Sequence, residues 1–348
     1  MMPLARRIWN AARIPLAGLL LAFVCLIVSF EVYAIVTART EGHAALPPTF
    51  GNFQRVVDLL PDDTEDEAFS FAVAGDTTSC GTYERLAEEL KDEPVSFMVL
   101  LGDCVRDGTE GNHMYFRAEL STELATPYPV FYVVGNHDVD PERFPLSQFE
   151  SMYGPTNFFF RYHNSLFVFL RALPGYRMDE TIGFLENVLS THRRDSDKVF
   201  VFMHIPPIHA STFAARNFEN EEALVALFEK YHVDYVCAGD YHGYARGEVN
   251  GTVYLVTGGG GAHLKDAKFG AFHHAVVITV EPNAVHERIL FVPRDEDLED
   301  GLERFALAEF VPWISARWPL VIFLNVAATA VLVCAVRLLA RAVRLRSR

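Results

Sequence analysis

Long uncharged hydrophobic stretches lie near both ends of the chain, and shorter apolar runs fill the region between them. Residues 14–30 contain no charged side chain, the apolar stretch continues to residue 36, and residues 318–336 are also uncharged. As a helix, the 23 residues at 14–36 would extend about 34 Å, which is enough to cross the hydrocarbon core of a bilayer. We therefore predict two transmembrane helices, at residues 14–36 and 318–336.

Arginine residues flank both predicted spans on the side of the chain ends. Arg6, Arg7 and Arg13 precede the first span, and Arg337 and four further arginines follow the second. Positive residues beside a span favour the cytoplasm, so the tails at 1–13 and 337–348 are predicted to be cytoplasmic and the middle periplasmic, extracellular or luminal. A cleaved signal peptide is the alternative for the first span, but the stretch is long for one and no convincing Ala-x-Ala site follows.

Between the spans, short apolar runs alternate with charged segments. Runs at residues 69–74, 97–101, 129–134, 199–203 and 235–238 predict buried strands, and segments at 83–91, 115–124 and 221–231 predict helices. Residues 157–162 and 165–170 flank His163-Asn164, which predicts a hairpin with a two-residue turn. This pattern predicts a layered α/β domain at 68–293, with linkers at 37–67 and, strongly acidic, at 294–317.

Charge is distributed very unevenly along the chain. All 45 Asp and Glu lie between Glu31 and Glu309, together with 21 of the 30 Lys and Arg, which gives that stretch a formal charge of −24. So negative a domain disfavours nucleic acid as a partner and repels anionic lipid headgroups.

Each of the five apolar runs ends at a side chain that can bind a metal. The residues are Asp76, Asp103, Asn136, His204, and the pair Asp240 and His242. In open α/β sheets the carboxyl ends of parallel strands meet at one edge, so we expect these side chains to converge. Carboxylate, amide and imidazole groups bind divalent first-row metals, and six of them are enough for two ions.

Residues next to these strand ends are candidates for other roles. His137 follows Asn136 and can face a substrate, while Asp138 can hold the His137 imidazole in one tautomer. His113, His273, His274 and the glycines at 258–261 are weaker candidates for lining the pocket, each with a purely structural alternative.

The order of these motifs resembles the calcineurin-like metallophosphoesterase superfamily, which includes the purple acid phosphatases, over roughly residues 69–293. The resemblance implies a four-layer αββα sandwich of two mixed sheets and two divalent metal ions. It implies that Asp76 and His242 hold one ion, that Asn136 and His204 hold the other, and that Asp103 bridges them. His137 would be the histidine beside the substrate that binds no metal.

Two positions depart from the family pattern. Thr78 stands where the family usually has a histidine ligand, and Asp240 stands where it usually has the first histidine of Gly-His-x-His. Asp240 would remain a ligand, but as an anionic oxygen. A site poorer in imidazole and richer in oxygen favours Mn²⁺, Mg²⁺ or iron over Zn²⁺, with manganese first.

The sequence therefore predicts a membrane-anchored, metal-dependent phosphoester hydrolase in which a hydroxide activated by two metals attacks phosphorus. Membrane-associated phosphodiesters are the first substrate hypothesis. The alternatives are a phosphomonoesterase or nucleotidase, a protein phosphatase, and a catalytically silent metal-binding sensor or interaction module.

Overall fold

The computed structural model describes residues 4–42, 44–62, 68–78, 81–207, 218–265, 270–295 and 298–346. The chain divides into two compact units, one formed by residues 1–43 and 303–348 and the other by residues 44–302. Parts of both predicted linkers, at 63–67 and 296–297, lie outside the described residues.

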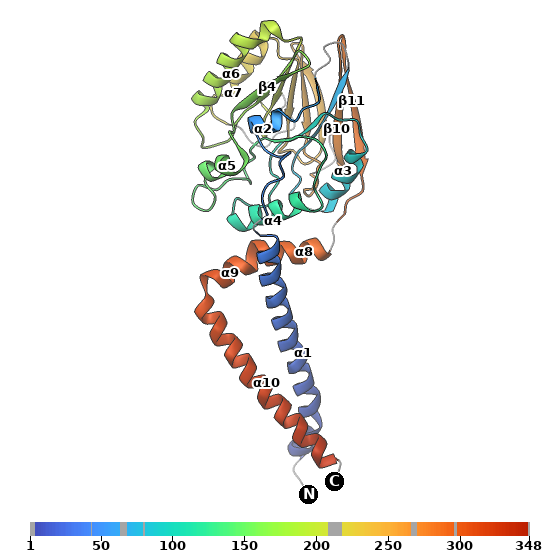
Figure 1. The fold of residues 1–348 in the computed structure, drawn as a ribbon, viewed down its shortest axis with the longest axis vertical. Helices are drawn as coiled ribbons and strands as arrows, with labels where there is room; N and C mark the ends of the chain where they lie inside the picture. The colour runs from blue at the N-terminus through green and yellow to red at the C-terminus, as the bar shows by residue number, and fades with distance from the viewer. Residues whose placement is uncertain are drawn as a thin grey trace. The chain divides into compact units, whose positions relative to one another are not determined.

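Two mixed β-sheets form the centre of the larger unit (Figure 1). The first sheet has the strand order β11 (Ala284–Val292), β10 (His273–Glu281), β1 (Phe69–Ala74), β2 (Phe97–Leu100) and β3 (Val130–Tyr132). The second has the order β4 (Phe158–Tyr162), β5 (Ser165–Phe169), β6 (Lys198–Phe202), β7 (Tyr235–Ala238), β9 (Thr252–Thr257) and β8 (Tyr244–Val249). Parallel pairing joins β1, β2 and β3 in the first sheet and β5, β6, β7 and β9 in the second.

Alternation along each strand separates the core into layers. Phe71 of β1 and Phe97 of β2 stack at 5.0 Å and meet Phe167 and Phe200 of the second sheet edge to face. Ala72, the next residue along β1 after Phe71, belongs to a different buried cluster, because successive side chains point to opposite faces of a strand. An aromatic layer therefore joins the two sheets.

Helices cover the outer faces of the sheets. Leu86 and Leu90 of α3 share a buried cluster with Ala72, and Leu224 and Phe228 of α7 belong to the same cluster. The helices of this unit are α2 (Gln54–Val57), α3 (Gly81–Lys91), α4 (Glu110–Ser121), α5 (Leu146–Tyr153), α6 (Met178–His192) and α7 (Glu221–Lys230), with a 3₁₀ turn η1 at Arg193–Asp195; α8 (Leu298–Arg304) lies at the boundary between the units.

The predicted four-layer α/β sandwich is confirmed, with differences in detail. His163 and Asn164 form the predicted two-residue turn, both with positive φ, at 46° and 52°. The run at 129–134 forms a strand only over Val130–Tyr132, since the following residues turn into the loop that carries Asn136. Strand β8 was not predicted, because its sequence YARGEV alternates polar residues along a partly exposed edge strand.

Part of the predicted first linker belongs to the sheet. Phe50 pairs with Val130 in a parallel bridge, and Gly51 N–H donates to the Val130 carbonyl at 2.9 Å. Asn52 is 1 % exposed, and its side chain donates to the Tyr132 carbonyl at 2.7 Å and accepts from the Tyr132 N–H at 2.9 Å. The segment therefore covers the edge of β3, whose backbone groups need partners.

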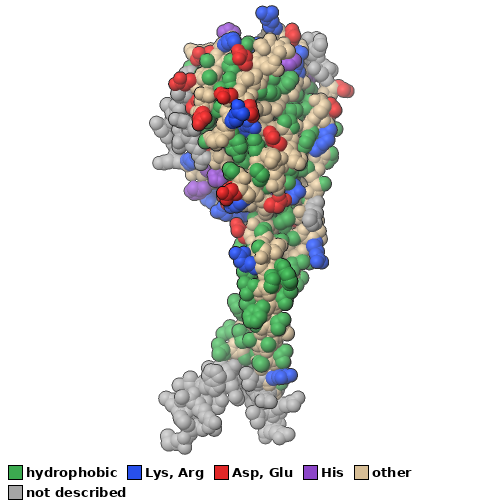
Figure 2. Space-filling model, turned by 90° about the vertical axis from the view of Figure 1, so that its left-hand side faces the viewer, with side chains coloured by type: hydrophobic (Ala, Val, Ile, Leu, Met, Phe, Trp, Pro, Cys, Tyr) green, Lys and Arg blue, Asp and Glu red, His purple; other side chains and the backbone are tan. Residues whose placement is uncertain are grey.

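The smaller unit contains two helices that are long and apolar enough to cross a membrane. They are α1 (Leu4–Thr40), apolar over Pro15–Thr40, and α10 (Trp318–Arg346), apolar over Trp318–Arg337. Few side chains of these stretches are buried within the protein, and Figure 2 shows hydrophobic groups along the surface of the two helices. Such a surface is typical of helices surrounded by lipid, although a signal sequence also fits the first helix.

Candidate metal centre

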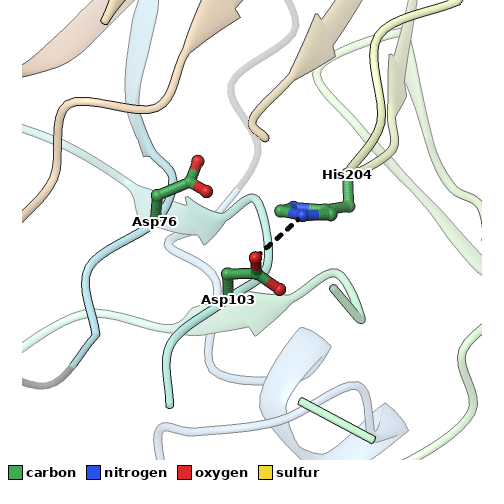
Figure 3. Close-up of side chains that lie close together, drawn as sticks. All are labelled: Asp76, Asp103 and His204. Carbon is green, nitrogen blue, oxygen red and sulfur yellow. Dashed lines mark ion pairs between the residues drawn. The ribbon is translucent and has the colours of Figure 1, made fainter. Parts of the chain in front are cut away.

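The candidate ligands converge from both sheets. Asp76 and Asp103 follow β1 and β2 of the first sheet, and His204 follows β6 of the second. One ligand atom from each lies within 4.8 Å of the others, and Figure 3 shows the three side chains turned toward one another. Parallel strands of two stacked sheets thus bring residues more than 100 positions apart in sequence to one point.

Asp240 and His242, from the loop after β7, complete this cluster. His204 Nε2 lies 3.2 Å from Asp103 Oδ2 and 3.9 Å from Asp240 Oδ1. His242 Nε2 lies 3.3 Å from Asp76 Oδ1. Asp76, Asp103, His204 and Asp240 are at most 3 % exposed, so three carboxylates are gathered in a buried space.

The three aspartates share an unusual backbone conformation. Asp76, Asp103 and Asp240 have φ angles of 56°, 52° and 58°, and Thr78 has φ 52°. Residues other than glycine rarely adopt this left-handed conformation, which costs of order 1–3 kcal/mol each and persists where function requires it. The same conformation at the ends of three different strands therefore marks this edge as the functional one.

Glycines allow the loops to approach these carboxylates. A Cβ at Gly258 would lie 2.6 Å from Asp76 Oδ2, and one at Gly239 would lie 2.8 Å from the same oxygen. A Cβ at Gly102 would lie 2.6 Å from His204 Nδ1. Gly258 belongs to the predicted glycine run, which therefore makes room around a candidate ligand.

Backbone carbonyls orient both histidines of the cluster. His204 Nδ1 lies 2.7 Å from the Leu101 carbonyl, and His242 Nδ1 lies 2.7 Å from the His263 carbonyl. A carbonyl only accepts, so each Nδ1 carries the proton and each Nε2 faces the carboxylates. This is the arrangement usual for metal-binding histidines.

The charge balance of the cluster calls for a cation. Burial alone would lower the pKa of His204, but the carboxylates of Asp103, Asp76 and Asp240 outweigh it and raise that pKa to about 10. Burial raises the pKa of Asp76. Asp76 Oδ2 and Asn136 Oδ1 are buried with no hydrogen-bond partner among the described residues, as expected for atoms that bind a metal. The residues present therefore fit divalent metal ions.

The structure corrects the predicted contact between Asp138 and His137. Asp138 is buried, and its oxygens accept hydrogen bonds from the N–H groups of Gly135 and Asp103 at 2.6 and 2.8 Å, the Cys104 N–H at 2.9 Å and the Tyr132 hydroxyl at 2.6 Å. The exposed His137 instead places Nδ1 3.0 Å from the Arg106 carbonyl. Its backbone N–H donates to Asp103 Oδ1 at 2.7 Å. Asp138 therefore joins the Asp103 and Asn136 loops, whereas Arg106 orients His137.

Three weaker candidates take structural positions. His113 is buried, stacks on Phe144 at 3.7 Å, and bonds the Tyr153 hydroxyl at 2.9 Å and the Asp138 carbonyl at 2.8 Å. Burial lowers its pKa to about 3, so it stays neutral and supports the loop from behind. His274 is buried against Thr257 and His273 against the Gly259 carbonyl, at 3.0 and 3.1 Å.

Supporting residues that the sequence did not indicate include Tyr132, which lies in an apolar run and was assigned to the core. Lys265 was also missed. Its backbone N–H donates to the His242 carbonyl at 2.9 Å, and its ammonium donates to the Asp240 carbonyl at 2.7 Å. Lys265 therefore holds both residues of the fifth strand end in place.

Comparison with known proteins identifies the family. The family model described as calcineurin-like phosphoesterase matches residues 69–244, which are 176 of the 348 residues. No curated protein matches the chain in sequence. Among solved structures, a dimetal phosphatase from Danio rerio superposes with a TM-score of 0.52 at 16 % identity, covering 65 % of this chain and 97 % of that one.

Two further structures superpose with slightly lower TM-scores. A purple acid phosphatase from yellow lupin (Lupinus luteus) has a TM-score of 0.48 at 18 % identity, covering 69 % of this chain and 56 % of that one. GAP50, described as the anchor in the inner membrane complex of Plasmodium, also has a TM-score of 0.48 at 18 % identity, covering 69 % of this chain and 95 % of that one.

The family model matches just over half of the length of this chain. The chain therefore belongs to the calcineurin-like phosphoesterase family and is a metal-dependent hydrolase of phosphoric esters.

Proposed function

We propose that this hydrolase uses two divalent ions, is anchored by two transmembrane helices, and acts outside the cytoplasm on membrane-associated phosphodiesters. The observation that carries the catalytic part is the convergence of Asp76, Asp103 and His204, whose ligand atoms lie within 4.8 Å of one another in a buried space. The two long apolar helices support the anchoring.

The family pattern and the contacts support a division of the ligands. Asp76 and His242, whose Oδ1 and Nε2 atoms lie 3.3 Å apart, would hold the first ion, and Asn136 and His204 would hold the second. Asp103, which accepts from the His137 N–H and lies 3.2 Å from His204 Nε2, would be shared by both ions. Asp240, whose Oδ1 lies 3.9 Å from His204 Nε2, would join the second ion. When bound, two such ions neutralise phosphoryl oxygens and lower the pKa of water, so that water can attack phosphorus.

His137 handles the leaving group. It is exposed at the rim of the cluster, one residue beyond Asn136. Because Nδ1–H donates to the Arg106 carbonyl, Nε2 is the nitrogen left to face an anionic ester. With Nε2 also protonated, the imidazolium ring donates to the departing oxygen from there, so it stabilises the negative charge that develops on that oxygen or transfers the Nε2 proton to it.

The ligand set favours manganese. Four of the six proposed ligands offer oxygen, namely Asp76, Asp103, Asn136 and Asp240. Hard oxygen ligands suit Mn²⁺ and Mg²⁺, whereas imidazole and thiolate favour Zn²⁺. Protein purified without added metal is therefore expected to contain manganese or iron in excess of zinc, and stoichiometric, tightly held zinc would contradict this preference.

Activity on a matched pair of chromogenic substrates tests the catalytic proposal. The full-length protein in detergent is assayed with Mn²⁺ on an aryl phosphomonoester and the corresponding diester. Asp103→Asn keeps the shape of the bridging side chain but removes its charge. The control is Asp107→Asn, the same change at an exposed position of the same loop.

We expect hydrolysis of the diester to exceed that of the monoester and to fall to background only in Asp103→Asn. Equal activity in wild type and Asp103→Asn would refute the site. Tight Mn²⁺ binding without hydrolysis of either ester would favour the alternative of a silent sensor or interaction module. Preference for the monoester would favour the phosphomonoesterase or nucleotidase alternative.

The arginines beside both spans support a topology with both termini in the cytoplasm. Protease added to sealed, right-side-out cells or vesicles is then expected to cleave the catalytic domain and to spare tags at both termini. Digestion of either tag in intact vesicles would contradict the proposed orientation.

A further inference from the structure

The segment between the catalytic domain and the second apolar helix has the surface of a membrane-interface element rather than of a linker. It consists of a π-helical turn η3 (Phe305–Phe310) and a short helix α9 (Val311–Ala316), both within the smaller unit. These twelve residues, 305–316, contain a single charged side chain, Glu309. Phe305 and Trp313 are 49 % and 38 % exposed, so aromatic surface faces outward.

Aromatic contacts fix this segment against α1. Phe30 of α1 contacts Phe305 at 5.6 Å and Phe310 at 5.0 Å between ring centroids. Phe310 then stacks on Trp313 at 6.2 Å, and the Arg317 guanidinium lies over the Trp313 ring at 5.7 Å. The segment therefore lies at the level of Phe30, and α10 leaves the direction of α9 at Arg317 (Figure 1).

The position of Phe30 along α1 gives the depth of the segment in a bilayer. At 1.5 Å per residue, Phe30 lies about 24 Å along the helix from residue 14, where the uncharged stretch begins. A hydrocarbon core about 30 Å thick that starts there would end within about 6 Å of Phe30. Phe305 and Phe310 would therefore lie at the boundary between hydrocarbon and headgroups.

The second apolar helix gives the same depth independently. Its apolar stretch, Trp318–Arg337, is 20 residues long, or about 28 Å, so Trp318 lies at one boundary when Arg337 lies near the other. Residues 305–316 connect the level of Phe30 to the level of Trp318. Both helices thus place the segment at the outer boundary, where tryptophan, which has an apolar ring and a polar N–H, is favoured over fully aqueous or fully apolar surroundings.

We propose that residues 305–316 form an interfacial element that lies in the headgroup region of the outer leaflet, with the exposed rings of Phe305 and Trp313 in contact with lipid. The partner is the lipid bilayer itself. The inference rests on the proposed membrane anchoring, but it is independent of catalysis. It shortens the aqueous part of the predicted linker at 294–317 to the residues before Phe305.

Depth-dependent quenching of tryptophan fluorescence tests the proposal. The chain contains Trp9, Trp313 and Trp318, and a variant with Trp9→Phe and Trp318→Phe reports on Trp313 alone. The full-length variant is reconstituted into phosphatidylcholine vesicles that carry bromine either near the glycerol backbone or near the chain ends, and aqueous iodide is added separately.

Two matched variants calibrate the measurement. Trp9→Phe with Trp313→Phe leaves Trp318 at the start of the span. Replacing all three tryptophans by Phe and adding His286→Trp gives a reporter on β11 of the catalytic domain, where the side chain is 64 % exposed. We expect shallow bromine to quench Trp313 more strongly than deep bromine does, because an interfacial ring lies at the headgroup level, and we expect iodide to quench it weakly. The His286→Trp reporter should respond to iodide alone.

Every other pattern overturns the inference. If iodide quenches Trp313 as it quenches the His286→Trp reporter, the segment is an aqueous linker. If deep bromine quenches Trp313 more strongly than shallow bromine does, the segment belongs to the span. If none of the three agents quenches Trp313, protein covers the ring. If Trp318 also escapes quenching by lipid, the anchoring fails as well. If Trp318 is quenched and Trp313 is not, the anchoring stands and only the interfacial element is wrong.

Discussion

The substitution Asp138→Asn separates the structural account of the metal centre from the sequence-based one. One Asp138 carboxylate oxygen accepts from the Gly135 and Asp103 N–H groups, and the other accepts from the Cys104 and Val105 N–H groups and the Tyr132 hydroxyl. Asparagine keeps this shape but replaces one oxygen by an NH₂ group. If the NH₂ group takes the place of Oδ1, the Tyr132 hydroxyl can rotate to accept from it, but the Cys104 and Val105 N–H groups then face another donor.

The expected loss of stability follows from these five bonds. A buried N–H group without an acceptor costs about 1–3 kcal/mol, and the remaining bonds weaken once the carboxylate charge is lost. We expect the free energy of unfolding to fall by about 2–4 kcal/mol in Asp138→Asn. Tyr132→Phe, which removes only the hydroxyl, should cost about 1.5–3 kcal/mol in the wild-type background and about 1 kcal/mol less in the Asp138→Asn background.

Urea unfolding of the two single variants and the double variant measures this coupling, while metal content and kcat are measured in parallel. Because Asp138 holds the backbone of Asp103 and Gly135, Asp138→Asn should lose bound metal together with activity. If Asp138 instead orients His137, the variant will keep its metal and its stability and lose only kcat. That result would refute the structural account.

Three further predictions follow from individual contacts. His137→Ala should lower kcat by about 10²–10⁴ while metal content stays normal; loss of metal would show that His137 is a ligand. Gly258→Ala should weaken metal binding, because its Cβ would collide with the Tyr241 carbonyl oxygen and lie 2.6 Å from Asp76 Oδ2, whereas Gly247→Ala, with no atom within 4 Å of its Cβ, should bind metal as the wild type does. Burial and the carboxylates of Asp300 and Glu123 raise the pKa of Glu84 from 4.5 to about 8, so the folded state loses stability as pH rises through that range. Glu84→Gln should therefore stabilise the protein at pH 9, by about 1 kcal/mol after solvent screening, and have little effect at pH 5; equal effects in urea unfolding at both pH values would contradict this.

The sequence indicated the position of the metal centre because its signals are local. An apolar run that ends in aspartate or histidine can be recognised from a few neighbouring residues, and parallel strands of one sheet have their carboxyl ends at a common edge. Asp76, Asp103 and His204 do lie together there. The hairpin turn at His163 and Asn164 could be predicted in the same way, because two apolar runs are separated by these two residues alone, and both residues do have positive φ.

The contacts that support the metal centre could not be predicted from the sequence, because they depend on which groups the fold brings together. Asp138 is adjacent in sequence to His137, yet its carboxylate accepts from the N–H groups of Asp103 and Cys104, which lie 35 and 34 residues away in the sequence. The backbone carbonyls of Leu101, His263 and Arg106 orient three histidines. Because every residue has a backbone carbonyl, the identity of the side chain cannot predict which residue takes this role. From the sequence Asn52 was assigned to a linker, and only the fold shows that it bonds the edge of β3.

The two departures from the family pattern occur in a backbone that other contacts hold in place. Thr78, despite the cost of positive φ for a β-branched residue, has its N–H bonded to the Asp103 carbonyl at 3.1 Å. Asp76 N–H donates to the Gly102 carbonyl at 3.0 Å, and the Asp76 carbonyl accepts from Ala262 at 2.7 Å.

At the other departure, the Asp240 carbonyl is held by Lys265. Hydrogen bonds to the main chain thus fix the loops that carry both departures, so exchanging histidine for threonine or aspartate changes the donor atoms without moving the site. A fixed geometry with more oxygen and less imidazole is expected to change which metal binds before it abolishes binding. This is why we favour an altered metal preference over a lost activity.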